Sequence, residues 1–291
     1  MKYLTFLVFL FTLSNLYSQD FELYEKESFV FENDTLNYRI LKPLNYNPSQ
    51  KYPVHLVLHG SGERGNDNSS QLTHGGVLFL KKQNREKYNS WVLFPQCSTN
   101  DRWANSTSDS WDAKFEDTIT KPNKSLQLVI RLMDQFIEKK QVDKQRIYVS
   151  GLSMGGMGTF EILYRRPNMF AAATPICGNG STAFASLYAK KVSIWVFHGS
   201  DDNVVSPKHS LNMVSAIIEA GGSPKLTLYE NVGHNSWDYA FDDKNYFAKQ
   251  SDLTIDLKEE VKEKSEELQR IIITLDEKEE RWLELSMKLE S

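Results

Sequence analysis

A serine flanked by glycines is the clearest chemical signal in the chain. Ser153 lies between Gly151 and Gly155 in the pattern G-x-S-x-G. An apolar segment at 147–150 precedes it, and a helix-like segment at 154–166 follows. A tight strand-to-helix turn exposes such a serine for attack on an acyl group, and flanking glycines let strand and helix approach closely. The spacing therefore predicts a nucleophile at Ser153, the alternative being an idle serine in a glycine-rich turn.

A serine hydroxyl attacks at neutral pH only with a general base beside it. Three histidines follow the motif. His198 ends an apolar segment, where we expect it to brace a turn, and His209 lies in a helix-like segment, where we expect it at the surface. His234 lies in the loop after the last apolar segment, 225–229. The base must come from that loop to reach Ser153, so we predict that His234 is the base.

The acid that orients the base is expected in the loop after the segment 192–198. Asp201 and Asp202 both lie there. The spacing His-Gly-x-x-Asp, followed by valine and proline, favours Asp202 as the acid that fixes the imidazole tautomer. Asp201 is then an ordinary turn residue, although its position alone qualifies it equally.

Two backbone N–H groups are needed to stabilise the oxyanion that forms on attack. One is predicted at Met154, directly after the nucleophile. The other is predicted in the glycine-rich loop 58–65, with Ser61 as the donor and Gly62 as the alternative.

These residues require a scaffold that brings loop ends together. Eight short apolar segments are predicted strands: residues 29–32, 36–41, 54–58, 91–95, 147–150, 171–176, 192–198 and 225–229. Four segments with helical spacing are predicted helices: residues 71–84, 125–140 (with Ser125 as its N-cap), 154–166 and 207–220. The first two strands form a hairpin, and strands alternate with helices afterwards. This order predicts an α/β fold with a doubly wound, mostly parallel eight-stranded sheet.

The N-terminus has the composition of a secretory signal peptide. A short charged start precedes an apolar run at 3–13, and small and polar residues follow. We predict a signal peptide at 1–18, export to the periplasm or the medium, and a catalytic domain at 19–250. A buried first strand or an uncleaved anchor is the alternative.

The chain changes character at residue 251. Residues 251–291 hold 7 Lys and Arg against 13 Asp and Glu, a net charge of −6, with no glycine or proline. Apolar residues recur there at seven-residue spacing: Val261, Leu268, Leu275, Trp282 and Leu289. The pattern predicts a long amphipathic helix or a coiled-coil strand that self-associates through 257–289. A single helix packed on the catalytic domain fits the pattern equally well.

Composition and cysteine count narrow the classes of partner. The net charge of −4 provides no basic surface, so we expect no nucleic-acid partner. Cys97 and Cys177 are the two cysteines. They can pair in an oxidising compartment or remain buried free thiols. No histidine cluster accompanies them, so neither a metal nor another cofactor is expected.

The motifs together resemble a known group. The chain is similar to α/β-hydrolases that include secreted polyhydroxybutyrate-depolymerase-like, feruloyl- and acetyl-xylan-esterase-like and predicted-peptidase proteins. The segments that carry the resemblance are 58–64, 92–97, 146–160, 170–178, 197–207 and 232–237. The resemblance implies the fold, the Ser153–Asp202–His234 triad and hydrolysis of esters or peptides. The segment 251–291 is not part of it.

The shape of the site suggests the kind of substrate. Only residues 178–191 separate the sixth and seventh predicted strands, too few for a cap domain. Trp103, Trp111 and Trp237 are candidate substrate platforms, with burial in the core as the alternative for the aromatic residues of the 98–124 insertion. We expect a small-molecule or polysaccharide ester, acylated or aryl. A prolyl-oligopeptidase-like peptidase and a catalytically idle binding protein are the remaining alternatives.

Overall fold

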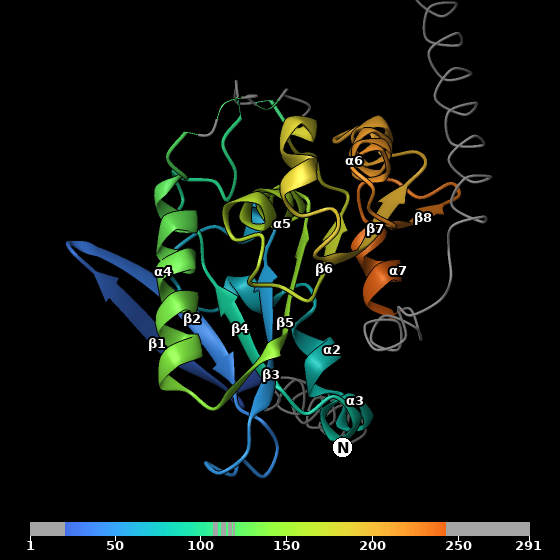
Figure 1. Ribbon diagram of the computed structural model, residues 1–291. Helices are drawn as coiled ribbons and strands as arrows, with labels where there is room; N and C mark the ends of the chain where they lie inside the picture. Colours follow the sequence, from blue (N-terminus) through green and yellow to red (C-terminus); the bar gives the residue numbers. More distant parts are fainter. Residues whose placement is uncertain (1–20, 107–109, 112–114, 116–117, 119, 243–291) are drawn as a thin grey trace, which may run out of the picture.

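A computed structural model describes residues 21–106, 110–111, 115, 118 and 120–242 (Figure 1). The predicted signal peptide at 1–18 and the predicted extension at 251–291 lie outside the described residues, so both stay predictions.

One eight-stranded sheet forms the centre of the described chain, in the order β1-β2-β4-β3-β5-β6-β7-β8. Its strands are β1 (Tyr24–Phe31), β2 (Asp34–Leu41), β3 (Tyr52–Leu58), β4 (Trp91–Pro95), β5 (Val142–Leu152), β6 (Ala172–Ile176), β7 (Ser193–Gly199) and β8 (Lys225–Tyr229). β2 pairs antiparallel with β1 and β4, and the remaining pairs are parallel. All eight predicted strands are thus confirmed, as is the predicted mostly parallel sheet.

Helices cover both faces of the sheet (Figure 1). The α-helices are α2 (Gly76–Leu80), α3 (Lys82–Lys87), α4 (Lys124–Lys139), α5 (Met154–Arg165), α6 (Pro207–Glu219) and α7 (Ser236–Asp242). The 3-10 helices are η1 (Ser61–Glu63), η2 (Ser70–Leu72) and η3 (Thr182–Leu187). Between β6 and β7 the chain forms only η3, which confirms that no cap domain is inserted there. In the described ranges, no helix has both the length and the apolar character needed to cross a membrane.

Alternating strand residues fill two separate cores, one on each side of the sheet. On β3, Leu56 and Leu58 pack into the core shared with α4, α5 and α6, whereas Val57 packs into the core with α2 and α7. On β4, Leu93 and Phe94 divide in the same way. Because successive side chains of a strand point to opposite faces, a strand buried on both faces reads as a continuous apolar run.

The predicted helix at 71–84 is wrong as a single element. The chain there forms η2, α2 and α3 in succession. Gly75 has a φ of 84°, in the left-handed region that ends a right-handed helix. The predicted N-cap is also displaced, because α4 begins at Lys124. The backbone N–H of Ser125 donates instead to Asp101 Oδ2 at 2.6 Å, so a distant carboxylate caps this helix.

Cys97 and Cys177 are free, buried thiols, so the disulfide alternative is wrong. Cys97 follows β4 and packs in the core with α4, whereas Cys177 follows β6 and packs in the core with α7. Three strand spacings separate β4 from β6, which corresponds to roughly 14 Å. A disulfide requires Cα atoms within about 7 Å, so the fold itself keeps the two thiols apart.

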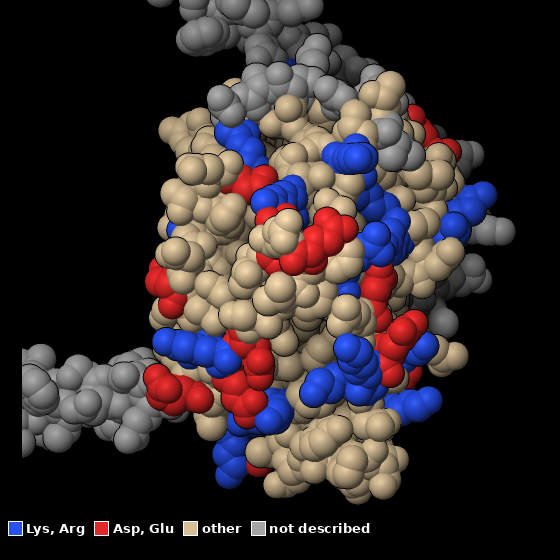
Figure 2. Space-filling model, turned by 90° about the vertical axis from the view of Figure 1, so that its left-hand side faces the viewer, with Lys and Arg blue, Asp and Glu red and all other residues tan. Residues whose placement is uncertain are grey.

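Charges of both signs are interspersed on the face that Figure 2 shows. Ion pairs join neighbouring elements, for example Lys42 with Glu25 and Lys124 with Asp34. Exposed pairs of this kind contribute little to stability, typically below about 1 kcal/mol each.

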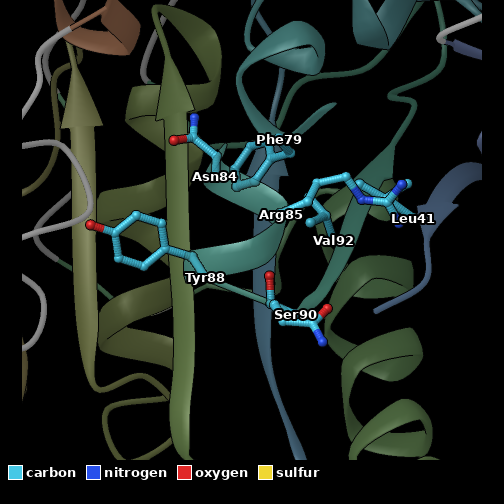
Figure 3. Close-up of a pocket in the computed structure, with 8 residues that line it drawn as sticks. Leu41, Phe79, Asn84, Arg85, Tyr88, Ser90 and Val92 are labelled. Atoms are coloured by element: carbon cyan, nitrogen blue, oxygen red, sulfur yellow. The ribbon is translucent and has the colours of Figure 1, made fainter. Parts of the chain in front are cut away.

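A small cavity lies between β2, β4 and the α2–α3 region (Figure 3). Its volume is about 10 Å³, the space of one water molecule. Two polar side chains around it hydrogen bond to the backbone. Asn84 Nδ2 donates to the Leu78 carbonyl at 2.7 Å, and Asn89 Nδ2 donates to the Leu44 carbonyl at 2.9 Å. The cavity contains none of the residues predicted to carry chemistry.

Candidate active site

Ser153 lies at the turn between β5 and α5, in a strained backbone conformation. Its φ is 52° and its ψ is −118°, outside the regions that ordinary residues prefer. The flanking glycines are needed because there is no room for a side chain. A Cβ at Gly151 would lie 2.2 Å from the Gly155 carbonyl oxygen, and one at Gly155 would lie 1.9 Å from the Leu58 carbonyl oxygen. The turn therefore has the geometry that the motif predicted.

The three residues predicted to act together are brought together by the fold. Ser153 Oγ lies 2.8 Å from His234 Nε2, and His234 Nδ1 lies 2.7 Å from Asp202 Oδ2. Ser153 follows β5, Asp202 follows β7 and His234 follows β8. The carboxyl ends of parallel strands meet at one edge of a sheet, which is why residues 32 to 81 positions apart converge there.

The surroundings of Asp202 keep its carboxylate ionised and fixed. Its side chain is fully buried, and burial alone would raise the pKa. Hydrogen bonds from His198, His234 and the backbone N–H groups of Val204 and Val205 outweigh that cost. They hold the pKa of Asp202 well below its usual range. A carboxylate in this state can orient the His234 ring and stabilise positive charge on it.

His198 braces this turn, as predicted. It is fully buried, its Nδ1 lies 2.7 Å from Ser210 Oγ, and its Nε2 lies 2.9 Å from the Val205 carbonyl oxygen. Asp201, the alternative acid, is exposed and accepts a hydrogen bond from Ser200 Oγ at 2.7 Å. The geometry thus places Asp202, not Asp201, against His234. His209 is half-buried on α6.

The predicted oxyanion donors lie on two adjacent segments. Met154 begins α5 and Ser61 begins η1. A Cβ at Gly60 would lie 2.8 Å from Leu152 Cδ1, so the loop after β3 runs beside the end of β5. The close contact of Gly155 with Leu58 brings the start of α5 to the same place. The two segments that carry the predicted donors therefore lie side by side next to Ser153.

Buried polar contacts hold the loop after β3. The His59 backbone carbonyl accepts a hydrogen bond from Trp103 Nε1 at 2.9 Å, and His59 Nε2 accepts one from the Cys97 N–H at 2.9 Å. Burial lowers the pKa of His59 to about 4, so the ring is neutral and its Nε2 can accept the hydrogen bond from Cys97. The Gly65 N–H donates to the Cys97 carbonyl at 2.9 Å. The loop is thus fixed before any substrate binds.

The three tryptophans predicted as substrate platforms have different surroundings. Trp103 is 0% exposed, so its prediction as a platform is wrong and its indole instead supports the loop at His59. Trp111 is half-buried, with the Arg102 guanidinium 4.3 Å from its ring. Trp237 is half-buried on α7, edge-on to the His234 ring at 5.4 Å between centroids. Of the three, Trp237 lies nearest to the catalytic geometry.

Sequence reasoning missed the role of Cys177 in this region. Burial raises the pKa of its thiol to about 12, so it is neutral. Cys177 Sγ, a carboxylate oxygen of Asp202 and a ring nitrogen of His234 all lie within 4.8 Å of one another. His234 and Asp202 already hydrogen bond to each other, so the thiol packs beside an assembled pair. The sequence signal for this position is that Cys177 directly follows β6, which pairs with β5, the strand that leads to Ser153.

Comparisons with known proteins agree with this architecture. The sequence profile of the phospholipase/carboxylesterase family matches residues 48–251. A solved thermostable esterase is 31% identical with a TM-score of 0.71, over 80% of this chain and 63% of that one. A bifunctional acetylxylan esterase/xylanase of Neocallimastix patriciarum is 28% identical over 167 residues, 57% of this chain and 21% of that protein. Acetylxylan esterase A of Emericella nidulans is 25% identical over 183 residues, 62% of this chain and 56% of its own length.

The sheet order and the strand–serine–helix turn define an α/β-hydrolase fold. Within that fold, the chain belongs to the phospholipase/carboxylesterase family. It spans about a fifth and about half of the length of the two curated relatives above.

Proposed function

We propose that the chain is a secreted serine hydrolase that cleaves carboxylic esters through an acyl-enzyme on Ser153. The observation that carries the proposal is the continuous hydrogen-bonded series from Ser153 through His234 to Asp202. Membership of the phospholipase/carboxylesterase family supports the same reaction class.

In the first half of the reaction, Ser153 Oγ attacks the ester carbonyl carbon while His234 Nε2 accepts the hydroxyl proton. The carbonyl oxygen becomes an oxyanion that the N–H groups of Met154 and Ser61 stabilise. The intermediate then collapses: the bond from carbon to the alcohol oxygen breaks, and His234 returns its proton to that oxygen. Asp202 stabilises the imidazolium between these two transfers.

In the second half, a water molecule takes the place of the alcohol. His234 accepts one proton from the water, whose oxygen attacks the acyl carbon on Ser153. Collapse of the second intermediate breaks the bond to Ser153 Oγ, and His234 returns the proton to the serine. The products are a free acid and a restored hydroxyl, so no redox partner or cofactor takes part.

The proposed substrates are acyl or aryl esters carried on carbohydrate or polymer. Two relatives are named acetylxylan esterases, which supports this class. The short connection between β6 and β7, which forms only η3, leaves no inserted cap to enclose a long acyl chain. Export through cleavage of a signal peptide at 1–18 belongs to the same proposal, because polymeric substrates lie outside the cell.

The test replaces the proposed nucleophile. Ser153→Ala is expected to lower kcat for p-nitrophenyl acetate by roughly 10⁴–10⁶ and to abolish labelling by a fluorophosphonate. The fold is expected to persist, because alanine fits the turn. Ser215→Ala is the matched control, since the Ser215 hydroxyl bonds Glu219 on the exposed side of α6.

Retained fluorophosphonate labelling in folded Ser153→Ala protein would overturn the assignment. A panel of acetyl, feruloyl and p-nitrophenyl esters beside peptide anilides separates the ester hydrolase from the peptidase alternative. Faster turnover of the anilides would replace the proposed reaction with peptide hydrolysis.

A further inference from the structure

The proposed reaction fixes where the alcohol part of an ester must lie. The leaving oxygen has to come within hydrogen-bond distance of His234 Nε2 to receive its proton. The carbonyl oxygen accepts from the proposed oxyanion donors Met154 and Ser61. The Trp237 ring lies edge-on to His234, and the His74 ring lies 5.2 Å from Trp237. The alcohol part is therefore expected beside a wall that we define as the rings of Trp237 and His74.

A carboxylate with unused hydrogen-bonding capacity lies beside His74. Glu63 ends η1 and is 9% exposed. Its Oε2 is buried without a hydrogen-bond partner among the described residues, and its Oε1 lies 3.7 Å from His74 Nε2, too far for a direct hydrogen bond. A buried carboxylate oxygen left without a partner is costly and calls for an explanation other than local stability.

Support of the loop does not explain Glu63. The loop is already held by Gly65 bonding to Cys97, by Arg64 Nε donating to the Ser61 carbonyl at 3.0 Å, and by Gln96. Gln96 Nε2 contacts the backbone carbonyl of Glu63, not its side chain. The carboxylate thus combines an oxygen without a hydrogen bond among the described residues with a side chain that is 12% exposed, and its Oε2 would lie 3.0 Å from a Cβ at Gly60, in the loop beside the end of β5.

The wall and the neighbouring Glu63 carboxylate together offer three kinds of contact. Trp237 offers an aromatic surface, Glu63 accepts hydrogen bonds, and His74, with its side chain 31% exposed, can donate or accept. A sugar presents an apolar C–H face together with hydroxyl donors, so it matches all three groups. An aryl alcohol without further hydroxyls matches only the aromatic surface.

We infer that Glu63 and His74 form an alcohol-side subsite that binds a hydroxyl of the sugar carrying the ester, with Trp237 against the sugar ring. The inference rests on the proposed function and narrows it to esters of polyhydroxylated alcohols. Glu63 and His74 then determine specificity and take no part in proton transfer.

The test compares two acetyl esters that differ only in the alcohol. Steady-state kinetics are measured with an acetylated xylo-oligosaccharide and with p-nitrophenyl acetate. Glu63→Gln is expected to lower kcat/KM for the acetylated sugar by about tenfold, because a charge-assisted hydrogen bond becomes a neutral one. The value for p-nitrophenyl acetate is expected to stay within about threefold of the unmodified protein, since that alcohol makes no such bond.

A second variant protects the test against misfolding. His74→Phe keeps a ring against Trp237 but removes both nitrogens, and it is expected to lower kcat/KM for the sugar ester alone by about threefold or more. Glu86→Gln is the matched control, because Glu86 is exposed on α3 and pairs with Lys82. Ser153→Ala protein titrated with the acetylated oligosaccharide gives the affinity without turnover, which Glu63→Gln in that background is expected to weaken.

The outcomes separate the subsite from the proposed function. A parallel fall for both esters in Glu63→Gln and His74→Phe would overturn the subsite and assign both residues to loop support. Turnover of p-nitrophenyl acetate without turnover of the acetylated sugar would also overturn the subsite while leaving the ester hydrolase in place. Failure to turn over either ester would instead contradict the proposed function.

Discussion

Asp201 and Asp202 are neighbours in sequence but differ in burial and in hydrogen-bond partner. Asp202 is buried and lies 2.7 Å from His234 Nδ1, whereas Asp201 is exposed and accepts from Ser200. Asp202→Asn is expected to lower kcat by about 10³–10⁴, because the amide no longer fixes the imidazole tautomer. Asp201→Asn is expected to stay within about threefold of the unmodified protein. Esterase kinetics on both variants check the difference, and equal losses would show that the acid is misassigned.

His55 links stability to pH through its burial. It is 6% exposed on β3, with its ring 4.9 Å from Tyr148 and 5.4 Å from Phe79. Burial lowers the pKa of His55 to about 3, whereas an unfolded chain has a value of about 6.5. Between these values the unfolded state binds the extra proton, so the free energy of unfolding falls as the pH falls.

The expected contribution of His55 is a loss of about 2 kcal/mol between pH 7 and pH 5. His55→Phe keeps a ring in the same place and removes the titration. Urea unfolding at pH 7 and pH 5 is expected to show a smaller pH-dependent loss in this variant. Parallel losses in both proteins would mean that His55 is protonated in the folded state or that other groups dominate.

Individual residues of the site can be predicted from the sequence where the chemistry requires a particular residue type. They cannot be predicted where two side chains come together only in the folded chain. Ser153, Asp202 and His234 could be predicted because each follows a recognisable strand. The approach of Glu63 to His74 could not, because η1 and the segment before Gly75 are neighbours only in the fold, where His74 and Gly75 pack against α7. Trp103 was misread because an aromatic residue in a polar segment looks like a surface residue.

Strand ends, more than helices, determine how this site is assembled. All eight strands could be predicted because strands buried on both faces leave continuous apolar runs. The helices were harder, because their ends depend on single backbone angles and remote partners. The left-handed φ of Gly75 divides the predicted helix at 71–84, and the carboxylate of Asp101 caps α4 from another loop. Neither effect leaves a periodic signal in the sequence.

The turn between β5 and α5 allows a direct test of the close contact behind Ser153. Gly155→Ala is expected to destabilise the protein by about 3 kcal/mol or more, because its Cβ would lie 1.9 Å from the rigid Leu58 carbonyl oxygen. Gly62→Ala is the control, since nothing lies within 4 Å of its Cβ, and it is expected to change stability by less than about 0.5 kcal/mol. Denaturant unfolding measures both. Equal stability of the two variants would contradict the packing described for the turn.

The whole molecule combines a domain whose proposed catalytic residues end at His234 with a segment of different composition. The family match ends at residue 251, where the acidic segment begins. No residue after α7 is required by the proposed reaction, and the proposed wall of the site ends at Trp237. The sequence therefore predicts that catalysis and the segment 251–291 are separable, which the structure of the described residues leaves as a prediction.

A chain that ends at Gln250 tests that separation. It is expected to keep its kcat/KM for p-nitrophenyl acetate within about twofold, because every group in the proposed mechanism is retained. Burial of the apolar residues spaced by seven, Trp282 among them, is favourable by roughly 25 cal/mol per Å² of apolar surface.

Mass and melting temperature identify the partner against which these residues are buried. If that partner is another copy, light scattering will give a larger particle mass for the full chain than for the shortened one. If the partner is the catalytic domain, both will be monomers and the shortened chain will melt at a lower temperature. Folded, shortened protein without esterase activity would contradict the separation, because the segment would then be shaping the site around Ser153.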